Sequence, residues 1–238
     1  MIGVRSHELG LRAWTEVPLG AVIVLPLGST EQHGPHLPLG TDTIVAERLA
    51  LAAAQSVEAV AVVAPAVAYG SSGEHAGFAG TLSIGRKALE MIVTELVRSL
   101  DDSRPAGVVL VNGHGGNLHP VLAAIRTLTD EGRRVEAWWP SDPDGDAHAG
   151  RTETSVMLHL APELVSLDKM AAGQTRPLNE LAETLRREGL RAVTASGVLG
   201  DPTGATAEHG AALVLRWTAE IAGLITGLRS LTGATGGG

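Results

Sequence analysis

Acidic and histidine side chains are grouped in a loop close to the start of the chain. Residues 28–42 read GSTEQHGPHLPLGTD and contain Glu31, His33 and Asp42. In an extended backbone, side chains two residues apart point the same way, so Glu31 and His33 can face one ion together. Carboxylates and imidazoles are suitable ligands for Zn, Mn or Fe(II). The structural alternative gives Glu31 and His33 surface roles and Asp42 a helix-capping role, and the segment alone fits both readings.

A glycine-rich loop follows an apolar run at residues 107–111. It reads NGHGGN, and its three glycines let the backbone turn tightly and approach a ligand while His114 is displayed at the end of a strand. A dinucleotide-binding turn is a weak alternative, because Leu118 stands where the third glycine would be. The His-Gly-Gly string is also typical of an esterase oxyanion loop, but the chain has no G-x-S-x-G motif to supply the nucleophilic serine. A metal-ligand role for His114 is the reading that fits best.

Residues 146–157, DAHAGRTETSVM, contain a third group of candidates. His148 lies in a Gly/Ala loop with no apolar pattern that would bury it, and we take it as a candidate catalytic residue. Glu153 has an ordinary explanation, because an acid is favourable in the first turn of a helix that Thr152 could cap.

Residues 69–81, YGSSGEHAGFAGT, are too rich in glycine to form core. Glu74 and His75 in this segment could orient a metal ligand. They could equally stabilise the loop, and the structural role is the reading we favour here.

The elements that must position these loops are read from the apolar pattern. Strands are expected at 21–27, within 57–67, at 107–111 and at 134–139, and helices at 41–55, 86–100, 118–130, 153–160, 178–188 and 205–228. Apolar strands alternating with helices predict an α/β fold with a mostly parallel sheet covered on both faces. Ligands bind at the carboxyl ends of such strands, so the loops after 21–27 and 107–111 should lie side by side. We expect one domain over 1–231 and a Gly-rich, disordered tail over 232–238.

Composition narrows the class of protein. The 238 residues contain no cysteine, which excludes disulfides, thiolate metal sites and a cysteine nucleophile. The net charge of −8 and the single Tyr and Phe argue against nucleic acid as a partner. No secretory signal is apparent, and no apolar run approaches the roughly 18 residues of a membrane span. We therefore expect a cytoplasmic protein that does not bind a membrane.

Four strings in order, GSTEQHGPHLPLGTD, YGSSGEHAGFAGT, NGHGGN and HAGRTETS, resemble the creatininase (creatinine amidohydrolase) family over about residues 14–160. The stretches 177–180 and 197–208 are similar to one branch of it, the creatininase-family peptidases of the mycofactocin system. The resemblance implies a three-layer α/β/α sandwich, assembly into homo-oligomers, and a dinuclear divalent-metal centre. In this chain we expect one or two ions (Zn, Fe(II) or Mn).

The resemblance also implies roles for single residues. Glu31 and His114 would bind one ion, His33 the other, and Asp42 would bridge the two. His148 would correspond to the catalytic histidine.

This chain departs from creatininase at one ligand. Creatininase has a glutamate two residues after the histidine that corresponds to His114, and Gly116 stands there in this sequence. Either one ion binds, or Glu153 supplies the missing carboxylate. We favour Glu153, as a metal ligand and as part of the catalytic group, because an ion with so few ligands needs another anionic one.

The implied reaction is metal-assisted hydrolysis of an amide bond. The branch resemblance implies a modified ribosomal peptide as substrate, the mycofactocin precursor, cleaved near its C-terminus to release a crosslinked Val-Tyr dipeptide. Hydrolysis of a small cyclic amide or formamide is the alternative within enzymes, and a non-catalytic metal-binding module is the alternative outside them. The sequence leaves open whether Trp138 and Trp139 line the pocket or pack in an interface. Of the two, we favour the interface.

Overall fold

The computed structural model describes residues 7–58 and 60–233 of the chain. Strands and helices alternate along most of it. In chain order the main elements are β1 (Val22–Leu27), α1 (Thr41–Ser56), β2 (Ala61–Val63), α2 (Arg86–Arg98), β3 (Gly107–Asn112), α3 (Leu118–Asp130), β4 (Val135–Trp138), α4 (Arg151–Leu160), α5 (Leu178–Glu188) and α6 (Ala207–Gly233).

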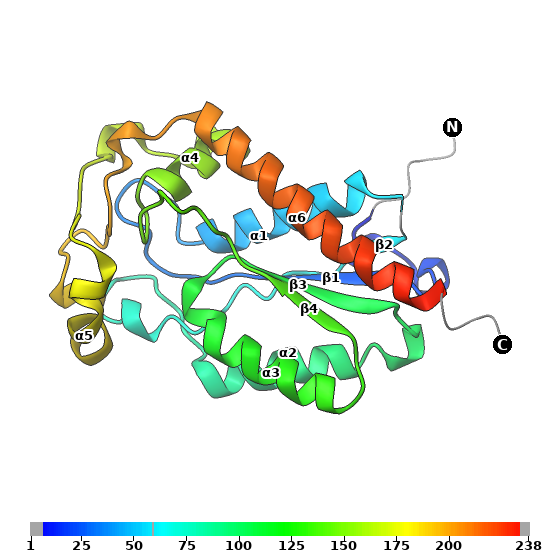
Figure 1. Cartoon of the computed structure of the whole chain (residues 1–238). Coiled ribbons are helices and arrows are strands. Elements are labelled where there is room, and N and C mark those ends of the chain that lie inside the picture. Colours follow the sequence, from blue (N-terminus) through cyan, green and yellow to red (C-terminus); the bar gives the residue numbers. More distant parts are fainter. Residues whose placement is uncertain (1–6, 59, 234–238) are drawn as a thin grey trace.

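The four strands form one parallel sheet in the order β2-β1-β3-β4. Helices α1, α4 and α6 cover one face of the sheet, and α2 and α3 cover the other (Figure 1). The predicted three-layer α/β/α sandwich with a parallel sheet is therefore confirmed.

Strand β1 is apolar throughout because it is buried on both faces of the sheet. Val22 and Val24 pack into the core under α1, α4 and α6, whereas Ile23, Leu25 and Leu27 pack into the core over α2 and α3. Because side chains alternate across a strand, a strand covered on both faces needs apolar residues at successive positions.

The loops after β1 and β3 are neighbours, as predicted, because the two strands pair along their whole length. The Gly113 N–H donates to the Leu27 carbonyl at 2.8 Å, and the Asn117 side-chain amide donates to the Gly28 carbonyl at 3.0 Å. These bonds hold the glycine-rich loop against the start of the acidic loop, so residues far apart in sequence meet at the carboxyl end of the sheet.

Helix α1 begins at Thr41, as predicted, but its N-cap is Gly40, so Asp42 lies inside the first turn and does not cap the helix. The limits of other helices differ from the prediction. Helix α4 begins at Arg151, two residues earlier than predicted, because the Asp146 carboxylate accepts the N–H groups of its first turn, and Thr152 is not the cap. Helix α6 extends to Gly233, into the predicted tail.

The rest of that tail, 234–238, lies outside the described residues. The single domain over 1–231 stays a prediction.

One helix in the described ranges, Ala207–Ser230 of α6, is long and apolar enough to cross a membrane by length and composition alone. One side of α6 packs against α1 and α4, with Leu213, Trp217, Ile221 and Ile225 buried in the core. That packing buries one stripe of the helix, 28% of its apolar window.

Candidate metal centre

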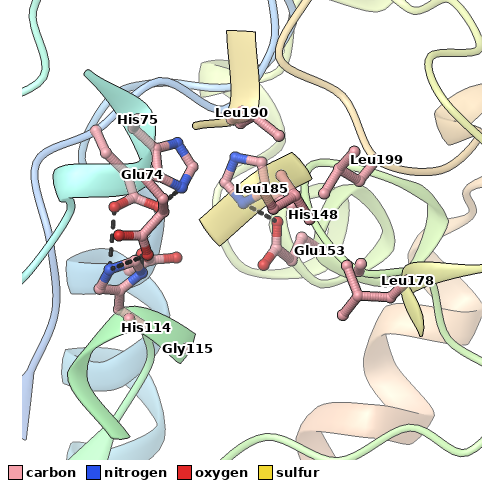
Figure 2. Close-up of a pocket in the computed structure, with 14 residues that line it drawn as sticks. Glu74, His75, His114, Gly115, His148, Glu153, Leu178, Leu185, Leu190 and Leu199 are labelled. Carbon is pink, nitrogen blue, oxygen red and sulfur yellow. Dashed lines mark ion pairs between the residues drawn. The ribbon is translucent and has the colours of Figure 1, made fainter. Parts of the chain in front are cut away.

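The predicted ligands and catalytic residues come together at the carboxyl ends of β1 and β3. A pocket of about 210 Å³ opens there. Its polar lining is formed by Glu31, Asp42, Glu74, His75, His114, His148 and Glu153 (Figure 2). His33 is fully buried and contacts Asp42 from behind this lining.

His33 is oriented as a metal-ligating histidine usually is. Its Nδ1 lies 3.1 Å from the backbone carbonyl of Glu31, to which it can donate. Its Nε2 then faces the cluster, 2.9 Å from Asp42 Oδ1 and 3.9 Å from Glu153 Oε2. A backbone partner on the second ring nitrogen fixes both the tautomer and the ring plane of a ligand.

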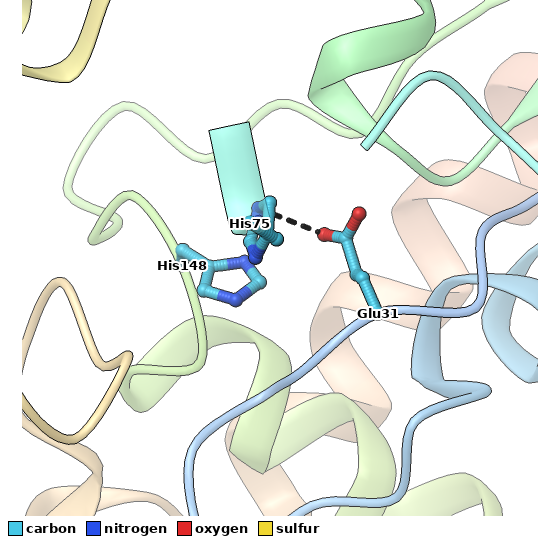
Figure 3. A group of neighbouring side chains, drawn as sticks. All are labelled: Glu31, His75 and His148. Atoms are coloured by element: carbon cyan, nitrogen blue, oxygen red, sulfur yellow. Dashed lines mark ion pairs between the residues drawn. The ribbon is translucent and has the colours of Figure 1, made fainter. Parts of the chain in front are cut away.

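Glu31 has a buried carboxylate with no hydrogen-bond partner among the residues that the structure describes. Its Oε1 lies 3.1 Å from His75 Nε2 (Figure 3), and its Oε2 lies 3.2 Å from His114 Nε2. Neither approach has hydrogen-bond geometry, so within the described part of the chain both oxygens are unsatisfied although the residue is fully buried. A buried carboxylate of this kind is costly unless a cation neutralises it.

Asp42 lies between two histidines. Its Oδ1 faces His33 Nε2, and its Oδ2 lies 3.2 Å from His114 Nδ1. The Ser29 hydroxyl donates to Oδ2 at 2.7 Å and fixes the carboxylate plane. Each oxygen of Asp42 thus faces a different imidazole.

Glu153 and His148 lie on the opposite side of the pocket from His114 (Figure 2). The Glu153 Oε2 atom is 3.9 Å from His148 Nδ1 and accepts the Ala149 N–H at 2.6 Å. Ala149 has a φ of 52°, a left-handed conformation that is strained for any residue with a Cβ. Such strain is found where the surrounding structure holds a functional loop in place. Here the strained residue directs its N–H to the carboxylate.

Gly116, where creatininase carries a glutamate, has no room for a side chain. A Cβ built on it would lie 2.4 Å from Glu74 Oε1, 2.4 Å from His114 Nε2 and 2.4 Å from the Ser71 carbonyl oxygen. The carboxylate of Glu74, which belongs to the short 3-10 helix η3 (Gly73–His75), therefore occupies the space that a residue-116 side chain would need.

Burial and the charges of neighbouring side chains shift the pKa values of residues in the cluster. Burial alone would lower the pKa of His33, but the charge of Asp42 and its hydrogen bond raise it to about 10. Burial alone would raise the pKa of Asp42, but His33 and His114 hold it well below its usual value. Burial lowers the pKa of His75 to about 3 despite the nearby charge of Glu31. Without an ion, protons on His33 neutralise part of the acidic cluster, and a bound cation would replace them.

Two features of the site were not predicted from the sequence. The first is Gln32, whose side-chain amide nitrogen lies 3.0 Å from His75 Nδ1 and 3.1 Å from His148 Nε2 and so contacts two imidazole rings of the site. An amide gives no distinctive signal in sequence beside so many titratable neighbours. The second is a group of leucines from the C-terminal part of the chain, Leu178, Leu185, Leu190 and Leu199, which forms the apolar side of the pocket.

Trp138 and Trp139 are absent from the pocket lining in the described residues. Trp138 is buried, packs edge-to-face on Trp217 of α6, and donates from Nε1 to Glu220 at 2.7 Å. Trp139 is partly buried beside the core over α2 and α3. Trp138 therefore joins the sheet to α6 within the fold.

Comparison with known proteins agrees with this geometry. The family model for creatininase, described as creatinine amidohydrolase, matches residues 12–225. A relative from Mycolicibacterium smegmatis, named mycofactocin precursor peptide peptidase, is 47% identical over 221 residues, covering 86% of this chain and 89% of the relative.

Two solved structures share the fold. A single-residue variant of creatininase superposes with a TM-score of 0.81 at 27% identity, covering 94% of this chain and 99% of the other. A manganese form of creatininase superposes with a TM-score of 0.77 at 27% identity, covering 93% of this chain and 98% of the other. With a family model that spans most of its length, this chain belongs to the creatininase family of metal-dependent amidohydrolases.

Proposed function

We propose that this chain is a metal-dependent peptidase that cleaves the modified mycofactocin precursor peptide near its C-terminus and releases the crosslinked Val-Tyr dipeptide. The family is one of hydrolases that act on C–N bonds, and the relative of 47% identity is named for this peptide. The observation that carries the proposal is the meeting, in one pocket, of carboxylates and imidazoles from separate loops around the unsatisfied carboxylate of Glu31.

The donor set fits divalent ions. Ligand atoms of Glu31, His33 and Asp42 lie within 4.8 Å of one another, as do those of His33, His148 and Glu153. In this proposal Glu31 and His114 would hold one ion, and His33 would hold a second. Asp42 would contribute to both ions, and Glu153 would stand in for the glutamate that creatininase carries at the position of Gly116. Zn, Mn and Fe(II) all accept such oxygen and nitrogen ligands.

The reaction is the addition of water to the scissile carbonyl followed by cleavage of the C–N bond. Bound divalent ions would polarise the carbonyl and lower the pKa of water toward about 7. His148 is held by its Nε2, 2.9 Å from the Gln32 carbonyl, which leaves Nδ1 toward Glu153 and the pocket. Nδ1 takes up the proton that the water loses and delivers it to the leaving nitrogen, so that a carboxylic acid and a free amine result, and the acid then ionises by losing its proton to solvent.

The proposal is tested with purified, metal-loaded protein incubated with the modified precursor peptide and, separately, with creatinine. Mass spectrometry should detect the C-terminal dipeptide and no turnover of creatinine. The His148→Asn variant should bind metal at the wild-type level and lose most of the activity. Turnover of creatinine without cleavage of the peptide would overturn the peptidase assignment in favour of a small cyclic amide substrate, the activity for which the family model is named.

A non-catalytic metal-binding module makes a different prediction. Such a protein would hydrolyse neither substrate at any metal content, and His148→Asn would change nothing measurable. Homo-oligomeric assembly, which the family resemblance implies, and a cytoplasmic location, which the composition favours, are also part of the proposal.

A further inference from the structure

One side of the pocket is apolar. Leu178, Leu185, Leu190 and Leu199, which we call the leucine wall, line it together (Figure 2). His148 and Glu153 line the same pocket as these leucines (Figure 2).

The leucine wall is built from three segments. Leu178 and Leu185 belong to α5, Leu190 begins the short 3-10 helix η8 (Leu190–Ala192), and Leu199 lies in the loop before α6. Leu190 and Leu199 are buried and pack with Leu181 of α5 in a small separate core. Leu178 remains 50% exposed at the pocket, although exposing an apolar side chain to water is unfavourable in free energy.

Backbone hydrogen bonds join the leucine wall to His148, the proposed proton donor. His148 and Leu199 form an antiparallel bridge, in which the His148 N–H donates to the Leu199 carbonyl at 3.1 Å and the Leu199 N–H donates to the His148 carbonyl at 2.9 Å. The backbone that fixes His148 therefore also fixes the wall beside it. A group that receives its proton from His148 lies next to these leucines.

We propose that the leucine wall binds the side chain of the residue that supplies the leaving amine, and that it selects an apolar side chain there. The inference rests on the proposed function, because it takes from it the role of His148 at the leaving nitrogen. Apolar groups added to a substrate raise the rate of its reaction when the site gives them a matching surface. A small polar amide has no side chain to place against the wall.

The test compares two fragments that differ only at the residue carrying the leaving amine, valyl-tyrosine and glycyl-tyrosine. Their dissociation constants are measured by calorimetry with metal-loaded protein. We expect wild type to bind valyl-tyrosine at least about tenfold more tightly, since loss of a few apolar carbons costs that much in a fitted pocket. The near-isosteric variants Leu178→Asn and Leu185→Asn should each reduce this preference, with bound metal unchanged by elemental analysis.

Leu215→Asn is the matched control, because Leu215 is 74% exposed on α6 and absent from the pocket lining. It should keep the wild-type preference. Equal binding of the two fragments by wild type, or an unchanged preference in both wall variants, would overturn the inference even if the precursor peptide is cleaved. A valine preference that the wall variants lose, in a protein that does not cleave the peptide, would support the wall and reject the proposed function.

Discussion

A side chain at position 116 would collide with three groups of the site. Gly116→Ala places a Cβ against Glu74 and His114, and also against the Ser71 backbone, which cannot move aside easily. We predict that this variant binds divalent metal about tenfold or more weakly, because groups packed around a ligand usually contribute a factor of that size. Titration with a chromophoric chelator measures the dissociation constant.

Gly115→Ala is the control for this prediction, since a Cβ at Gly115 meets no atom within 4 Å. It should bind metal as wild type does. Equal affinities in the two variants would mean that the crowding at 116 has no consequence for the ions.

The metal-free protein should lose stability as the pH rises above neutrality. Because the pKa of His33 is raised from 6.5 to about 10 on folding, its contribution is complete below pH 6.5 and is lost as the pH rises through 10. Between these values the free energy of unfolding should fall by on the order of 1 kcal/mol per pH unit. Urea unfolding in the presence of a chelator measures it.

The His33→Gln variant should show a shallower fall over the same range. A metal-free wild type whose stability is constant or rises between pH 7 and 9 would contradict the ionisation described for this cluster.

At the scale of elements, Asp146 determines where α4 begins. Its carboxylate accepts the N–H groups of Arg151 and Thr152, and it is enclosed by Gly150 and Gly200, where any Cβ would overlap it. We predict that Asp146→Ala costs about 1–2 kcal/mol of stability, as loss of a helix N-cap does. It should also lower kcat, since the first turn of α4 carries Glu153.

Asp201→Ala is a suitable control for that change. Asp201 caps only the short 3-10 helix that contains Thr203, and it is exposed. Thermal unfolding and steady-state kinetics on both variants separate the two effects. A similar loss of kcat in Asp201→Ala would mean that the start of α4 has no special part in positioning Glu153.

The elements were predictable where one pattern dominates. The limits of α3 and α5 agree with the apolar periodicity, and the apolar runs locate β1 and β3 because a strand covered on both faces has no polar positions. Within 57–67 the sequence could not place the strand, which is limited to Ala61–Val63. The start of α4 was less predictable, because the Asp146 side chain that caps it is five residues away from the first residue of the helix.

The site was predictable to the extent that its residues have chemical signatures. Acids and histidines beside glycines indicated the cluster around Asp42 from sequence. The leucine wall was not predictable, because Leu178 and Leu185 fit the apolar stripe of an ordinary amphipathic helix. Only the fold brings α5 to the same pocket as the loop that contains His148, some thirty residues earlier in the chain.

At the scale of the molecule, bound metal should stabilise the fold. The acidic and histidine ligands come from loops after two strands and from α1 and α4, so an ion binds the folded chain and not the unfolded one. With free ion at a hundred times its dissociation constant, the gain is about 2.7 kcal/mol. Calorimetric unfolding should show a higher Tm with metal, and Asp42→Asn should lose most of this shift.

The central claim is that side chains from separate loops share cations at one end of the sheet. Crystals of the metal-loaded protein, measured at the absorption edge of the bound metal, test it directly through an anomalous difference map. The account predicts two peaks about 3.5–4 Å apart with Asp42 between them and Glu153 in contact with the ion beside His33. A map with no peak beside Asp42, or with Glu153 turned away from every ion, would contradict it.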